Sequence, residues 1–122
     1  KYDRIKDEIH WQIHFIFPNT DFKTNKKFSE NVKIQDMVKT LLDTYENEKQ
    51  LDFYRAQGSS KIRVLLKTEG LKNNSNRFYD LDLNQTLKMC LSKKVIIEYP
   101  TLYIVFDYLI DNFETVDSDG KH

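Results

Sequence analysis

The sequence predicts an α+β fold, a small mixed β-sheet with helices packed on one face. Some segments alternate apolar and polar residues, as half-buried strands do, and others repeat apolar residues every three or four positions, as amphipathic helices do. Turn-forming residues separate these segments in the order β-α-α-β-β-α-β. A sheet covered on one side by helices satisfies that order with short connections.

The first half of the chain predicts one strand and two helices. The segment 9–17 reads IHWQIHFIF, with every odd-numbered residue apolar, and it ends at a proline. Residues 19–33 are polar and rich in lysine, so we expect a loop with a short edge strand near 28–32. The segment 34–45 has helical apolar spacing, and 51–58 predicts a shorter helix that ends at its glycine.

The second half predicts a hairpin, a helix and a closing strand. The hairpin pairs 61–68 with 77–83, and one register places Leu65 opposite Asp80 and Lys67 opposite Phe78. That register sorts apolar from charged residues on both strands at once. Asn84 is expected to cap a helix that runs to about residue 93 and buries its apolar face. The apolar segment 95–106 then closes the core.

Composition narrows the class of protein. The 122 residues indicate one domain, expected at 1–110, followed by an acidic flexible tail at 111–122. Lysine plus arginine equals aspartate plus glutamate at 19 each, so the net charge of zero does not require a nucleic-acid partner. No apolar run approaches the roughly 20 residues of a membrane span. The chain begins with Lys1 and shows no signal-peptide pattern, which indicates a fragment of a longer protein.

The residues suited to chemistry do not form a catalytic or metal site. His10 and His14 share a strand face about 13 Å apart at a strand's rise per residue, too far to hold one zinc ion. Cys90, the single cysteine, lies on the inner face of its predicted helix and is expected to be a buried structural thiol. We therefore expect no enzymatic activity and no cofactor.

A stripe of basic residues allows two interpretations. Lys61, Arg63 and Lys67 share one face of their strand, where they could bind phosphates or be neutralised by carboxylates across the hairpin. The zero net charge favours the second interpretation, although it leaves Phe78 on that polar face unexplained. The RNA-binding alternative adds the lysines of 19–33 and uses Phe78 to stack on a base. Its basic residues are Lys61, Arg63, Lys67, Lys23, Lys26 and Lys27.

Glu98 and Pro100 interrupt the apolar closing strand. A proline cannot donate to a β ladder, so Pro100 marks a bulge or a strand end, and Glu98 then reaches solvent or a nearby cation. The same bend would leave an unpaired sheet edge beside Tyr99 and Tyr103, where a partner's extended segment could add as a strand. The two interpretations are compatible. The partner-binding hypothesis therefore uses Phe78, Tyr99, Tyr103, Glu98 and Pro100.

Three sequence features together resemble the C-terminal domain of the box C/D snoRNA protein 1 family. They are IHWQIHFIFP at 9–18, FYDLDLNQTLKMCL at 78–91 and KVIIEYPTLYIV at 94–105. Members of that family are HIT-type zinc-finger factors for assembly of box C/D small nucleolar ribonucleoproteins (snoRNPs). The zinc finger itself is not in this chain, because one cysteine cannot build it.

The resemblance implies a nuclear, non-enzymatic assembly factor in ribosome biogenesis that helps snoRNP core proteins gather on box C/D snoRNA. Partners implied by the family are snoRNP core or assembly proteins and the AAA+ ATPase chaperone machinery. Direct binding of box C/D snoRNA is the alternative. We expect a monomer that acts in the nucleoplasm or nucleolus and takes no small-molecule substrate.

Overall fold

A computed structural model of the chain describes residues 2–5, 8–67, 77–91 and 100–116. It confirms the predicted α+β class, with a mixed seven-stranded sheet. The strands are β1 (Tyr2–Ile5), β2 (Glu8–Ile16), β3 (Lys23–Ser29), β4 (Ile62–Lys67), β5 (Phe78–Asp80), β6 (Thr101–Phe106) and β7 (Thr115–Val116). The helices are α1 (Ile34–Thr44), α2 (Asp52–Gln57) and α3 (Leu87–Leu91), with 3₁₀ turns η1 (Lys49–Leu51), η2 (Ser59–Lys61) and η3 (Asp107–Asn112).

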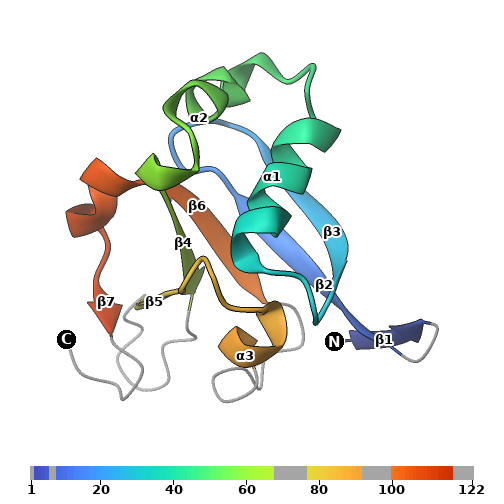
Figure 1. The fold of residues 1–122 in the computed structure, drawn as a ribbon. Helices are drawn as coiled ribbons and strands as arrows, with labels where there is room; N and C mark the ends of the chain where they lie inside the picture. The colour runs from blue at the N-terminus through green and yellow to red at the C-terminus, as the bar shows by residue number, and fades with distance from the viewer. Residues whose placement is uncertain (1, 6–7, 68–76, 92–99, 117–122) are drawn as a thin grey trace.

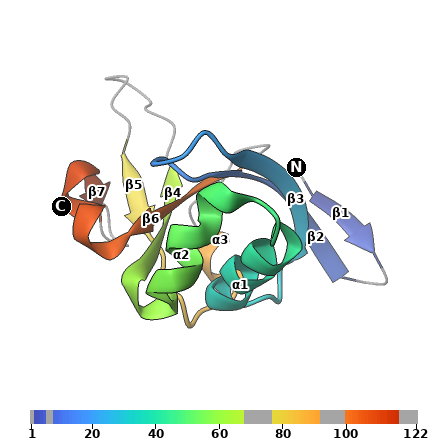
Figure 2. The ribbon, with the colours of Figure 1, turned by 90° about the horizontal axis from the view of Figure 1, so that it is seen from above.

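The strands follow the order β1-β2-β6-β4-β5-β7, and β3 pairs with β2 on the side away from β6. β2 and β6 run parallel, as do β5 and β7, while the other neighbouring pairs are antiparallel. Figure 1 shows β3 at one border of the sheet and β7 at the other. Seen from above, α1, α2 and α3 lie on the same side of the sheet (Figure 2). The helices therefore cover one face, as the sequence predicts.

The main core lies between that face and the helices. From β2 it takes Ile13 and Phe15, which are fully buried at the alternate positions that the sequence predicts. α1 contributes an apolar stripe at helical spacing, made of Ile34, Met37, Val38 and Leu41. The predicted inner face of α3 is also buried, with Leu87, Cys90 and Leu91 at 2 % exposure or less. Among the described residues, no polar or charged side chain is buried in this core.

Several element boundaries differ from the predictions for local reasons. β5 ends at Asp80 because the Asp82 carboxylate accepts the Asn84 N–H at 2.9 Å and turns the chain. α3 begins at Leu87, and Thr86 rather than Asn84 caps it: the Thr86 hydroxyl accepts the Met89 N–H at 3.3 Å. β3 is an edge strand earlier and longer than the one expected near 28–32. The chain also continues past 110 into η3 and β7, and β7 pairs with β5.

Tyr54 is the largest side chain that is almost completely buried, at 1 % exposure. Its hydroxyl donates to the Ile104 carbonyl at 3.0 Å, and its ring stacks on Phe106 with centroids 4.3 Å apart. Burial, assisted by the nearby Tyr108 phenol, raises the pKa of Tyr54 from 10.0 to about 12. The folded state therefore favours the neutral phenol.

That pKa predicts a specific alkaline destabilisation. The stabilising contribution of the neutral phenol is complete below pH 10, the unfolded pKa, and is lost as the pH rises toward 12. Between pH 9 and pH 11 the loss should be about 1.3 kcal/mol, from the linkage relation for one group. Urea denaturation at the two pH values measures it, with Tyr54→Phe as the reference. An equal pH dependence in Tyr54→Phe would contradict the assignment.

Candidate partner-binding surface

Among the described residues, η3 and the residues just after it cover one half of the sheet face away from the helices and leave the other half uncovered. In the covered half, Leu65, Phe78 and Val105 form a second core that is separate from the main one. Ile110 of η3 and Phe113 just after it pack against these residues. The segment expected to begin a flexible tail thus covers one end of the sheet, which explains why Phe78 can occupy an otherwise polar strand face.

Phe78 and Tyr103 were predicted to contact a partner, and the structure places them in this second core. Phe78 is 6 % exposed, and its ring packs edge-on against Tyr103 and Phe113 at centroid distances of 5.1 and 5.2 Å. Tyr103 is half-buried. Because aromatic edge-to-face contacts already occupy these rings, the Phe78 ring is not a surface for a partner or a base.

The prediction of an unpaired sheet edge beside Tyr103 is wrong. Tyr103 lies on β6, which pairs with β2 on one side and with β4 on the other. Pro100 is buried and precedes β6, and its carbonyl accepts the His14 N–H at 2.9 Å. Pro100 therefore lies immediately before the first residue of β6 and not within that strand. Glu98 and Tyr99 lie outside the described residues.

Arg63 is neutralised within the sheet. Its guanidinium forms ion pairs with Asp80 on β5 and with Asp107 on η3, the latter at 3.2 Å. The hairpin register is the predicted one, with Leu65 opposite Asp80 and Lys67 opposite Phe78, so the Arg63–Asp80 pair is diagonal. Burial raises the pKa of Asp80 and outweighs the opposing effect of Arg63. This ion-pair network supports the neutralised interpretation of Arg63.

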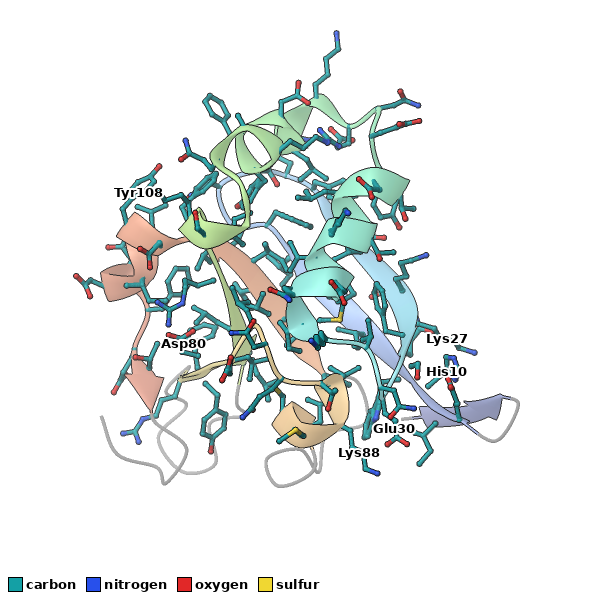
Figure 3. The ribbon with its side chains drawn as sticks, viewed as in Figure 1. His10, Lys27, Glu30, Asp80, Lys88 and Tyr108 are labelled. Atoms are coloured by element: carbon teal, nitrogen blue, oxygen red, sulfur yellow. The ribbon has the colours of Figure 1, made fainter. Side chains whose placement is uncertain are left out.

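The remaining basic residues of the RNA-binding hypothesis lie in separate parts of the structure. Lys61 is exposed in η2, and Lys67 is half-buried at the end of β4. Lys23 and Lys27 share the outer face of β3, whereas Lys26 lies on the opposite face with its Nζ 6.0 Å from the Phe28 ring centroid. Figure 3 shows Lys27 and Asp80 at opposite ends of the sheet. The six residues therefore do not form one basic patch.

The other half of the outer face presents a polar row across three strands. Asn25, His14 and Thr101 are cross-strand neighbours on β3, β2 and β6. Together with Gln12 they line a hollow of about 420 Å³. The His14 Nδ1 and Asn25 Oδ1 atoms lie 2.6 Å apart; the amide oxygen can only accept, so Nδ1 donates. These groups can hydrogen-bond to a polar ligand.

Sequence reasoning missed this polar row. The alternation of His10, Gln12 and His14 with apolar residues indicated a polar strand face, but nothing local indicated that Asn25 and Thr101 would lie beside His14. His10 and His14 do lie on that face, in β2. Within the described ranges, no group of three or more His, Cys, Asp or Glu side chains could hold a metal ion.

No helix in the described part of the chain is long and apolar enough to cross a membrane.

A family model described as "BCD1 domain" matches residues 1–115. The chain is also similar to the proteins named "Box C/D snoRNA protein 1" of Homo sapiens and Pongo abelii. Each is 28% identical over 109 residues, which cover 85% of this chain and 23% of the relative. The chain thus spans about a quarter of the length of these curated relatives.

Proposed function

Because the chain belongs to the BCD1 domain family, we propose that it is a non-enzymatic protein-binding domain of a box C/D snoRNP assembly factor. It acts in the nucleus, where it helps snoRNP core proteins gather during ribosome biogenesis. Its partners are snoRNP core or assembly proteins, among them the AAA+ ATPase chaperone machinery. The names of the curated relatives support an association with box C/D snoRNA.

The arrangement of the outer face supports protein rather than RNA as the direct partner. Binding of single-stranded RNA ordinarily combines exposed aromatic rings with a continuous basic groove. In the described residues the aromatic rings of the outer face pack on one another, and Arg63 is held by two carboxylates. In the part of the chain that the structure describes, the other half of this face presents a polar row beside the edge strand β3, and that combination suits a polypeptide partner.

Capture from nuclear extract with and without ribonuclease tests this proposal. We expect the tagged chain to retain snoRNP core or assembly proteins after ribonuclease digestion, because the contacts are between proteins. Loss of these proteins on digestion would contradict the proposal and favour RNA as the bridge. A parallel titration with box C/D RNA at low salt separates the two, since phosphate contacts give affinities that fall steeply with salt.

A further inference from the structure

The hydrogen bonds of β2 show which backbone N–H and C=O groups of β3 point out of the sheet. The His14 N–H donates to the Pro100 carbonyl, so His14 turns its backbone toward β6. In an antiparallel pair, the backbone N–H and C=O groups of two opposed residues either point toward each other or point away from each other. Asn25 is opposite His14, so the Asn25 N–H and C=O point away from β2 and out of the sheet. The Glu30 N–H to Ile9 carbonyl bond, at 2.8 Å, fits the same alternation.

The alternation extends to the neighbours of Asn25. Lys23 and Lys27 are two residues away on either side, so their backbone groups also point outward. In the described part of the chain, β3 pairs with β2 alone. The Ser29 carbonyl accepts the Val32 N–H at 3.1 Å, which closes the strand at its end. The outward-facing stretch is therefore 23–27.

The side chains along this edge are cationic. Lys23 lies on the outer face and Lys26 on the other, so a strand added here would meet positive charge on both faces. Asp21 and Glu30 flank the stretch in the sequence. Lysine on an edge strand discourages pairing with neutral or basic chains. The same lysines would attract an acidic strand.

We propose that the edge of β3 binds an acidic, extended segment of a protein partner, which adds to the sheet as a further strand beside 23–27. The inference rests on the proposed function and specifies the chemistry of the partner. Outward N–H and C=O groups need acceptors and donors in alternation, which a polypeptide backbone supplies. The phosphates of RNA only accept, so they could pair with the N–H groups of the edge but not with its carbonyls.

A designed peptide tests this inference. The probe is a fluorescein-labelled heptapeptide of alternating glutamate and valine, and its control carries lysine in place of glutamate. We expect fluorescence anisotropy to show binding of the acidic peptide only, weakened by salt. Amide shifts in ¹⁵N spectra should centre on 23–27. Equal binding of both peptides, no binding at millimolar peptide, or shifts confined to another surface would overturn the proposal.

Variants distinguish the contribution of backbone hydrogen bonds to peptide binding from the contribution of lysine charge. Asn25→Pro removes one outward N–H without removing a β2–β3 hydrogen bond and should weaken peptide binding at least fivefold, whereas Asn25→Ala should stay within twofold. Lys23→Glu with Lys27→Glu should weaken binding at least tenfold. The matched charge control, Lys39→Glu with Lys49→Glu, alters exposed lysines outside β3 and should leave binding unchanged. Wild-type affinity in Asn25→Pro would overturn the proposal.

The outcomes distinguish this inference from the proposed function. If Asn25→Pro loses the acidic peptide but the wild-type chain fails to retain snoRNP proteins after ribonuclease, the edge binds acidic strands and the proposed function fails. If Asn25→Pro retains snoRNP proteins as well as the wild-type chain does, the function stands and the partner binds another surface. Circular dichroism of each variant checks that the fold is intact.

Discussion

Replacing Phe78 with alanine is expected to lower the free energy of unfolding by about 3–5 kcal/mol, the usual cost of truncating a buried phenylalanine. Phe78 is 6 % exposed and contacts Tyr103 and Phe113 edge-on, so the truncation leaves a cavity and removes two aromatic contacts. The Phe78 N–H also donates to the Glu114 carbonyl at 2.9 Å, which ties the segment after η3 to β5. Urea denaturation followed by circular dichroism measures the loss.

The matched control is Phe53→Ala. Phe53 is 73 % exposed on α2, so the same truncation there should change stability by less than about 0.5 kcal/mol. A loss below about 1 kcal/mol for Phe78→Ala would mean that the ring is not covered by η3 and the residues after it. Phe78 would then return as a contact residue for a partner or for RNA.

Arg55→Ala should lower the free energy of unfolding by about 2 kcal/mol, because one guanidinium joins the end of α1 to α2. Its Nη2 donates to the Tyr45 carbonyl and to the Leu42 carbonyl, the latter at 3.2 Å. Its Nη1 donates to the Glu48 carbonyl at 3.2 Å and to Asp52 at 2.7 Å. Carbonyls at a helix C-terminus favour a cation, and charge-assisted hydrogen bonds are among the stronger ones. Thermal and urea denaturation both measure the effect.

Arg55→Lys should restore only a minor part of that stability. A lysine keeps the charge but lacks the planar fork that reaches several acceptors at once. Lys39→Ala, an exposed cation on α1, serves as the control and should lie within about 0.5 kcal/mol of wild type. Full recovery in Arg55→Lys would show that the charge alone, and not the hydrogen-bond geometry, stabilises this junction.

The sequence predicted those parts of the fold that depend on local periodicity. The alternation in 9–17 identified β2 and its buried residues, and the apolar stripe of 34–45 identified α1. The hairpin register could be predicted because only one pairing separates apolar from charged residues on both strands. In each case apolar side chains close together in the sequence must be buried on one face, and this requirement produces a periodic pattern in the sequence.

The remainder depends on contacts between distant segments, which leave little local pattern. The segment 107–116 is acidic, yet Ile110 and Phe113 cover Phe78 and Tyr103, so the second core could not be read from either segment alone. Tyr103 was expected beside an edge because nothing local shows that β6 lies between β2 and β4. The structure therefore favours β3 and the polar row around His14 as the candidate surface, in place of Phe78 and Tyr103.

We expect this domain to bind protein directly, through the β2–β3 end of the sheet. The most direct test is the amount of snoRNP protein retained after ribonuclease by the wild-type chain, by Lys23→Glu with Lys27→Glu, and by Lys39→Glu with Lys49→Glu. We expect full retention by the wild type and by the variant of Lys39 and Lys49, and loss by the β3 variant. Retention that disappears with ribonuclease in all three chains would contradict it.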